Sequence, residues 1–459
     1  MLAPIMSWMD EPKAPASPAQ TVMFGTCLEP ATTRAVEPSG SLEDVRIRRA
    51  NRSQVVMGPT DLDSQLPADD AARAIWAVVE RLDLSALYAQ IISRRGSAGA
   101  PAIDPKILLS LWIYAVSEGE TSAREIERQT KKNISYRWLC GEVSVNYHTL
   151  SDFRVKQRKV IDDLITQVLA LLMKRNLVEL KRIAQDGTRV RANAGAASFR
   201  TQASLDEMMR EAREHLDSVT ADSALPGWNE RRRASQVRAA KDRIQRLEEA
   251  LAELPEIEAT KKRSGAKDTE PRVSTTDPEA RVMKMGDGGF RPAYNVQFGT
   301  TTDAARVIVG VNVTNRGSDM AEAAPMVAQV EARTGVRPDE LLVDGGYVGH
   351  ASIDAVADQG VTVYGPVPRP RGGDPEQRFV ARADDSEAVA QWRQRMSTDE
   401  AKRIYKLRGS TAETVNADAK CKRGLSRISV VGKDKALGVA LLFALTYNVL
   451  RALSLGAFA

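Results

Sequence analysis

The chain has 459 residues, a net charge of +5, 43% hydrophobic residues and 27% charged residues. This is the balance of an ordinary soluble protein with two or three domains. The three cysteines, Cys27, Cys140 and Cys421, are scattered, and the three histidines lie far apart. We therefore expect no disulfide framework, a reducing cytoplasmic setting and no structural zinc site. The first residues also lack the pattern of a secretory signal.

Residues 1–70 are rich in Pro, Ala, Ser, Thr and Gly and show no sustained periodicity. They predict a flexible or extended N-terminal arm. Helical periodicity begins near residue 71. It continues in DPKILLSLWIYAVSEG, where Asp104 can cap a helix and Pro105 suits its first turn.

Residues 121–160 combine short helical segments and tight turns with nine Lys/Arg against four Asp/Glu. Short helices with a basic surface are typical of helix-turn-helix units that bind DNA, since DNA is a polyanion. We therefore predict an all-α, helix-turn-helix-like DNA-binding domain over residues 71–175. A plain helical bundle with a charged exterior is the alternative. The candidate DNA contacts are Lys131, Lys132, Arg137 and Arg154.

Residues 203–254 have the apolar spacing of two antiparallel helices. We predict a helical hairpin inserted over residues 203–272, with its second helix ending at Pro255. The basic run Arg231 to Arg233 could contact DNA or only solubilise the helix. Whether the insertion serves protein–protein or protein–DNA contact stays open.

Strand patterns return in AYNVQFGT and ARVIVGVNVTN, which predict an antiparallel strand pair. A helix, the strand ELLV, a helix from about residue 350 and the strand VTVYGPV follow. This order predicts a mixed α/β domain, a mixed sheet with flanking helices, over residues 176–202 and 273–459.

The most apolar stretch is ALGVALLFALTYNVLRALSLGAFA, at residues 436–459. Asn448 and Arg451 interrupt it, and Lys433 and Lys435 precede it. A buried helix that closes a globular core is the better interpretation of this length and polarity, so we expect no membrane partner.

Two aspartates follow short apolar strands. Asp186 stands in RIAQDGTRVRANA and Asp344 in ELLVDGGY. An isolated Asp-Gly pair is usually only a turn. Carboxylates at adjacent strand ends, in a chain poor in His and Cys, instead form an oxygen-only site suited to Mg²⁺ or Mn²⁺.

We expect Gly187 and Thr188 to turn the chain and to leave the Asp186 carboxylate facing a DNA backbone. Arg189 and Arg191 alternate along the following strand and therefore share one face, which would point toward that DNA.

A third carboxylate is expected from a helix, and Glu413 in YKLRGSTAETVNADAK is the candidate. A competing interpretation is local. Ser410 and Glu413 fit a capping box, in which Glu413 would reach back to the Ser410 backbone amide.

Together these motifs resemble the bacterial insertion-sequence DDE transposases. The resemblance rests on DGTRVRANA, LLVDGGY and the residues Tyr405, Arg408, Glu413 and Lys420, which match a Tyr/Arg/Glu/Lys signature, and it covers most of the chain from about residue 50. It implies an RNase H-like catalytic domain with Asp186, Asp344 and Glu413 as the acidic triad. It also implies that Tyr405, Arg408 and Lys420 contact phosphates of the transposon end.

One spacing departs from the better-known signature. Four residues, not three, separate Arg408 from Glu413. We expect Gly409 to break the helix there, so that the extra residue is absorbed before a new helix begins.

The resemblance implies metal-dependent cleavage at insertion-sequence ends and strand transfer into target DNA. Two Mg²⁺ or Mn²⁺ ions are expected, with no covalent protein intermediate. No GxxxxGK[ST] motif is present, so ATP is not expected. The expected partners are terminal inverted repeats, target DNA and a second copy of the chain in the synaptic complex, in the cytoplasm near the nucleoid. The alternatives are an inactive or repurposed DNA-binding regulator, or a nuclease of the same fold without strand transfer.

Overall fold

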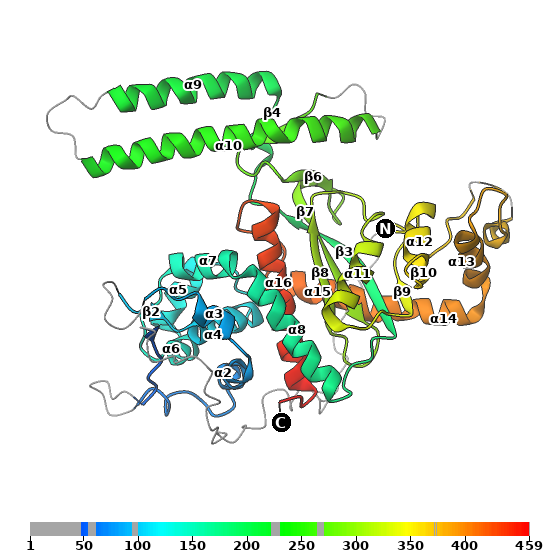
Figure 1. The fold of residues 1–459 in the computed structure, drawn as a ribbon, viewed down its shortest axis with the longest axis horizontal. Helices are drawn as coiled ribbons and strands as arrows, with labels where there is room; N and C mark the ends of the chain where they lie inside the picture. The colour runs from blue at the N-terminus through cyan, green and yellow to red at the C-terminus, as the bar shows by residue number, and fades with distance from the viewer. Residues whose placement is uncertain are drawn as a thin grey trace, which may run out of the picture.

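The computed structural model describes residues 47–53, 61–93, 100–221, 230–263, 270–370, 372 and 374–458. Most of the predicted N-terminal arm, and the loop of the predicted hairpin, lie outside these residues. Figure 1 shows a body made of a helical region and a sheet region, with two long helices extending beyond it.

The helical region contains α2 (Ala71–Arg81), α3 (Ser85–Ala89), α4 (Pro105–Ser117), α5 (Ala123–Lys132), α6 (Ile134–Cys140), α7 (Tyr147–Lys156) and α8 (Arg158–Lys174). The Asp104 side chain caps α4 by accepting a hydrogen bond from the Lys106 amide at 3.0 Å, as predicted. Leu62 and Leu66 are buried in the same core, so packing begins before residue 71. A short parallel pair joins β1 (Ile47–Arg48) to β2 (Ala102–Ile103).

The sheet region has its strands in the order β10-β9-β3-β7-β6, with β8 also paired to β7. Strands β9 and β10 are parallel to β3, whereas β7 is antiparallel to β3, β6 and β8. The bounds are β3 (Arg182–Arg191), β6 (Arg281–Lys284), β7 (Phe290–Thr301), β8 (Ile308–Thr314), β9 (Glu340–Leu342) and β10 (Thr362–Tyr364). This mixed sheet confirms the predicted α/β fold class and the predicted antiparallel pair.

Helices flank the sheet and complete the C-terminal part. They are α11 (Ala323–Thr334), α12 (His350–Ala357), α13 (Glu387–Ser397), α14 (Asp399–Arg408), α15 (Thr414–Cys421) and α16 (Lys433–Ser454), with a π-helical turn at Gly409–Glu413 between α14 and α15. A 3₁₀ turn at Pro375–Phe379 precedes α13.

Helix α16 is the one helix among the described residues that is long and apolar enough to cross a membrane. It is instead packed within the protein against α4, α8 and β8, in the middle of the body (Figure 1), and 83% of its apolar window is buried. The polar residue Asn448 within this apolar helix is buried and makes two hydrogen bonds to β8. It accepts a hydrogen bond from the Ile308 amide at 2.8 Å and donates one to the Ile308 carbonyl at 2.7 Å. The predicted buried helix is confirmed.

Strand β3 corrects the turn predicted at Gly187 and Thr188. The strand runs unbroken through both residues, which lie opposite Gln297 and Val296 of β7. Pairing with a strand more than one hundred residues away holds the backbone extended, and this long-range contact has no local sequence signal.

The two long helices are α9 (Gln202–Ala221) and α10 (Glu230–Arg263), and we call them the hairpin. A small antiparallel pair, β4 (Phe199–Arg200) with β5 (Val273–Ser274), lies at its base. The hairpin has a hydrophobic core of its own, separate from that of the body, formed by Leu205, Met209, Ala212, Leu247, Ala250, Leu254, Ile257 and Val273.

Helix α10 does not end at Pro255 as predicted but continues to Arg263. Proline in a helix interior loses one backbone hydrogen bond. Leu254 and Ile257, on either side of it, are both buried in the hairpin core. This packing holds the helix together across the proline.

Candidate active site

Asp186 and Asp344 lie at the same level on neighbouring strands. Parallel pairing matches Ala184 of β3 with Leu342 of β9, and each aspartate comes two residues later. Asp344 follows the carboxyl end of β9, as predicted. Asp186 lies inside the longer strand β3, so its predicted place at a strand end is wrong. It still lies beside Asp344, because the two residues hold equivalent positions along neighbouring strands.

Arg408 brings the three predicted acidic residues together. One guanidinium nitrogen lies 3.0 Å from Asp186 Oδ1 and 3.6 Å from Asp344 Oδ2, and another lies 2.7 Å from Glu413 Oε1. Three carboxylates from β3, the loop after β9 and the π-helical turn therefore converge on one cation. We call Asp186, Asp344, Glu413 and Arg408 the acidic cluster.

The π-helical turn accounts for the unusual spacing between Arg408 and Glu413. The helix neither breaks at Gly409 nor restarts at a cap. It widens for one turn and continues into α15. A π-helical turn accommodates one extra residue inside a helix and is frequent at functional sites. The buried Thr411 hydroxyl donates to the Leu407 carbonyl at 2.7 Å, which satisfies an acceptor in the widened turn.

Both local expectations for this segment are therefore wrong. Gly409 has ordinary helical angles, and the Glu413 carboxylate accepts a hydrogen bond from Arg408 instead of closing a capping box on Ser410. The π-helical turn itself packs against β3 and β7, which places Glu413 beside the strand that carries Asp186.

Burial sets the electrostatics of the acidic cluster. Burial raises the pKa of Asp186. The positive charge of Arg408 acts against this increase, and the negative charge of Asp344 adds to it. Burial lowers the pKa of Arg408, but its acidic neighbours, Asp186 first, raise that pKa by more, so the net shift is upward. The guanidinium is therefore firmly charged, and it offsets much of the repulsion among the three carboxylates.

Asn416 is a site residue that the sequence did not single out. Its side-chain nitrogen donates to Asp186 Oδ2 at 2.9 Å. Asn416 lies three residues after Glu413, so the two share a helix face, and this spacing was the available signal. Its Oδ1 is buried and has no hydrogen-bond partner within the described residues.

The side chains of the cluster fit a divalent cation in their chemistry. Three carboxylates and the unpaired amide oxygen of Asn416 form the all-oxygen set that Mg²⁺ and Mn²⁺ prefer. As they stand, no three His, Cys, Asp or Glu side chains among the described residues are close enough together to hold an ion, since the Arg408 guanidinium lies between them.

The predicted DNA contacts near the cluster are differently placed. Tyr405 is half-buried on α14, and burial raises the pKa of its hydroxyl. Lys420 is half-buried on α15, where burial lowers the pKa of its ammonium and the Asp186 carboxylate opposes the shift. Arg191 is exposed at the end of β3, whereas Arg189 donates to the Gly317 carbonyl at 2.9 Å.

The candidate contacts of the helical region lie mostly on its surface. Lys131 and Lys132 are exposed at the end of α5, and Lys131 forms an ion pair with Glu127 at 3.2 Å. Arg137 is half-buried and forms an ion pair with Glu142 at 3.1 Å.

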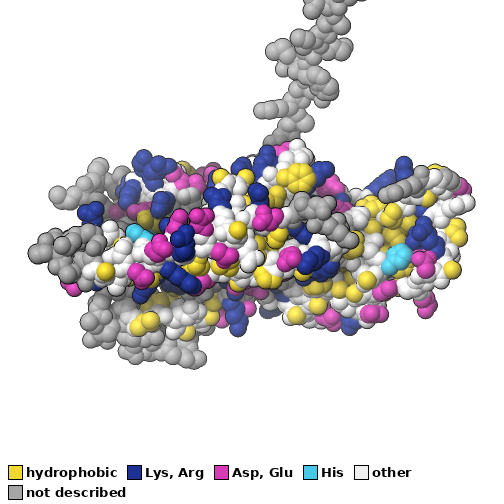
Figure 2. All heavy atoms as spheres, turned by 90° about the horizontal axis from the view of Figure 1, so that it is seen from above, with side chains coloured by type: hydrophobic (Ala, Val, Ile, Leu, Met, Phe, Trp, Pro, Cys, Tyr) yellow, Lys and Arg dark blue, Asp and Glu magenta, His cyan; other side chains and the backbone are white. Residues whose placement is uncertain are grey.

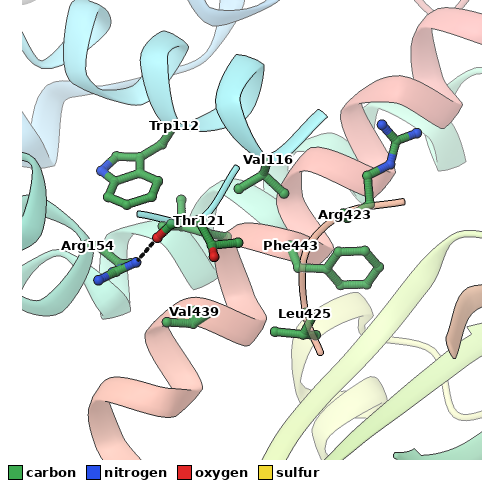
Figure 3. Close-up of a pocket in the computed structure, with 9 residues that line it drawn as sticks. Trp112, Val116, Thr121, Arg154, Arg423, Leu425, Val439 and Phe443 are labelled. Atoms are coloured by element: carbon green, nitrogen blue, oxygen red, sulfur yellow. Dashed lines mark hydrogen bonds between the residues drawn. The ribbon is translucent and has the colours of Figure 1, made fainter. Parts of the chain in front are cut away.

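Arg154 is an exception, because its side chain is buried. It donates to the Thr121 carbonyl at 2.8 Å and lies over the Trp112 ring, 4.7 Å from the centroid (Figure 3). Burial lowers its pKa to about 10. The surrounding pocket is largely apolar and is formed with Val116, Arg423, Leu425, Val439, Leu442 and Phe443. We therefore correct the interpretation of Arg154. It joins α7 to the protein interior and is not exposed to a DNA backbone.

Comparison with known families adds two matches. Residues 60–156 match the family described as Transposase domain (DUF772), and residues 373–453 match the family described as Transposase DDE domain. No curated protein matches the chain. Both matches place the chain in the transposase class. Together they support an insertion-sequence DDE transposase, which confirms the resemblance stated from the sequence. The second match includes Arg408, Glu413 and Asn416.

Proposed function

We propose that the protein is a DNA transposase that cleaves DNA at the ends of its insertion sequence and transfers the cut strand into target DNA. The observation that carries the proposal is the convergence of Asp186, Asp344 and Glu413 on one cation. A mixed sheet that carries two of these carboxylates side by side is also what an RNase H-like catalytic domain requires.

Asp186, Asp344 and Glu413 would hold two divalent ions. When bound, such ions supply an activated water or 3′-hydroxyl and stabilise the leaving oxygen of an in-line displacement. Asn416 orients the Asp186 carboxylate through its hydrogen bond. The partial burial of this cluster limits the access of bulk water and strengthens the interactions of the charges within it.

Arg408 has two roles in this proposal. In the protein alone it neutralises the carboxylates. With those carboxylates engaged by a cation, the Arg408 guanidinium would be free to donate two parallel hydrogen bonds to a DNA phosphate. Tyr405 and Lys420, on α14 and α15 beside it, would contact the transposon end.

The helical region over residues 71–175 would bind the terminal inverted repeats in helix-turn-helix fashion, through Lys131, Lys132 and Arg137. Two ends must be brought together for transposition, so we propose a homodimer in the synaptic complex. The cytoplasm, where the DNA lies, is the proposed location.

Cleavage of DNA that carries the element's own terminal repeats tests the proposal. In Mg²⁺, the wild-type protein should cut at the repeat ends and join them to target DNA. Asp344→Asn should bind the ends as tightly as wild type and fail to cut. Asp339→Asn is the matched control, because Asp339 is exposed at the opposite end of β9.

Three results would contradict parts of the proposal. Unchanged cleavage by Asp344→Asn would remove Asp344 from the site. End binding without cleavage by the wild type would favour a DNA-binding regulator. Cleavage without joining would favour a nuclease.

A further inference from the structure

A fourth carboxylate, Asp319, is buried beside the acidic cluster in the connection from β8 to α11 and is only 6% exposed. Its Oδ1 accepts hydrogen bonds from the side-chain amides of Asn295 at 2.5 Å and Gln297 at 2.7 Å, both on β7. Its Oδ2 faces Arg189 of β3 at 3.4 Å. Asp319 therefore ties together the two central strands of the sheet.

The same carboxylate lies close to a glycine that follows each aspartate of the cluster, Gly187 after Asp186 and Gly346 two residues after Asp344. A Cβ at Gly187, directly after Asp186, would lie under 3.0 Å from Asp319 Oδ1. A Cβ at Gly346 would lie 3.3 Å from Asp319 Oδ2 and 2.9 Å from Asp344 Oδ1. A glycine therefore suits position 187 because Asp319, Gln297 and Asn295 together fill the space that a side chain would need, and not because the chain turns there.

A second path connects Asp319 to the loop that follows Asp344. The Tyr347 hydroxyl donates to Gln297 Oε1, and Gln185 donates to the same oxygen at 3.0 Å. Gln297 in turn donates to Asp319. Tyr347 and Gln185 are fully buried, so this network is shielded from water and rigid.

We propose that Asp319 is a positioning residue that fixes the separation of Asp186 and Asp344. It holds β3 through Arg189, holds β7 through Asn295 and Gln297, and lies close to Gly346 in the turn that begins at Asp344. Its oxygens are engaged by these partners, so it acts through them and not on DNA. The proposal rests on the proposed function, since it assigns Asp319 a role in the same site.

The role requires that both oxygens of Asp319 accept hydrogen bonds. Three donor groups point at Asp319, and an asparagine would set an amide nitrogen against at least one of them. Groups that orient metal ligands typically change metal affinity or activity by about 10- to 100-fold when they are replaced. Asp319→Asn should therefore raise the Mg²⁺ concentration for half-maximal cleavage by about 10-fold or more.

The matched control is Asp277→Asn. Asp277 is also a fully buried aspartate beside β7, where its Oδ1 accepts from the Tyr294 hydroxyl at 2.6 Å and from the Gly432 amide at 3.2 Å. Among the described residues, none of its hydrogen bonds reaches the acidic cluster. Asp277→Asn should lower thermal stability and leave the Mg²⁺ dependence of cleavage unchanged, which separates positioning from a merely structural role.

Two readouts test the proposal: cleavage against Mg²⁺ concentration, and Mn²⁺ binding to the DNA-free protein by calorimetry. Asp319→Asn should bind DNA ends like wild type and bind Mn²⁺ at least about 10-fold more weakly. If that variant does not fold, Asn295→Ala, which removes one donor, should show a smaller shift in the same direction.

Wild-type metal dependence and Mn²⁺ affinity in Asp319→Asn, or an equal shift in Asp277→Asn, would overturn the positioning role and leave the proposed function standing. A wild-type protein that neither cleaves DNA nor binds Mn²⁺ would overturn the proposed function itself.

Discussion

The acidic cluster and the hairpin carry charge in opposite ways. The cluster holds four charged groups and lies beside the main core of the body. The side chains of Asp186 and Arg408 are only 14% and 11% exposed. The hairpin carries many charges on its outside and has a separate core. Figure 2, which views the molecule from the side of the hairpin, shows acidic and basic side chains interspersed on this face.

The charges of the hairpin also differ among themselves. Arg213 with Glu248 at 3.9 Å, and Arg243 with Glu211 at 3.7 Å, pair the two helices. Arg232, Lys241 and Arg246 are exposed on α10 and have no partner within the described residues. Substitutions in the cluster should therefore change the chemistry, while those in the hairpin should change only local stability or weak, salt-dependent binding.

The largest expected effect comes from the hairpin core. Leu247→Ala removes a buried side chain between α9 and α10, where such truncations cost about 2–5 kcal/mol. Because this core is separate from that of the body, hydrogen exchange should speed up in α9 and α10 and not in β3, β7 or β9. Cleavage by the folded body should continue. Faster exchange throughout the sheet would show that the two cores are one cooperative unit.

Arg408→Gln should have the next largest effect. It leaves three carboxylates facing one another and should lower the free energy of unfolding by about 1–3 kcal/mol. This loss is smaller than that for breaking a fully buried ion pair, because Glu413 is exposed. Mg²⁺ should restore more stability to this variant than to wild type, since a cation then replaces the lost charge. Urea unfolding with and without Mg²⁺ measures both.

The control for this substitution is Arg403→Gln, an exposed change on the same helix α14. An equal loss of stability in both variants, or no Mg²⁺ effect on Arg408→Gln, would argue against a shared role of Arg408 and a cation in the cluster.

The smallest expected effect is on DNA affinity. Replacing Arg232, Lys241 and Arg246 by Gln should weaken binding at low salt by less than about tenfold and leave the cleavage rate of bound DNA unchanged, because exposed charges act through a screened, salt-dependent field. Fluorescence anisotropy at several salt concentrations measures the affinity.

The control triple replaces Arg210, Arg213 and Lys262, three exposed hairpin residues in ion pairs, and removes the same charge. A loss of cleavage in either triple variant would contradict the assignment of catalysis to the acidic cluster and of only weak DNA binding to the hairpin.

Much of the fold follows from sequence patterns that are local. The Asp104 cap, the antiparallel strand pair and the apolar run of α16 each have a signal within one segment. The three acidic residues follow from the family resemblance, and of them only Asp344 also stands directly beyond the end of an apolar strand.

The remaining features depend on contacts between distant segments. β3 continues through Gly187 because β7 pairs with it. The π-helical turn at Gly409–Glu413 packs against β3 and β7, although its sequence fits a cap equally well. Arg154 is basic yet buried, and Asp319 has no motif around it; only the fold brings each to its partners.

On the proposed function, Asp186, Asp344 and Glu413 form one cation site. Calorimetric titration of Mn²⁺ into the DNA-free protein tests it directly, for wild type and for Asp186→Asn with Asp339→Asn as control. The account predicts that wild type and the control bind Mn²⁺ alike, and that Asp186→Asn loses at least one bound ion or binds at least about 10-fold more weakly. Equal binding by all three proteins would contradict it.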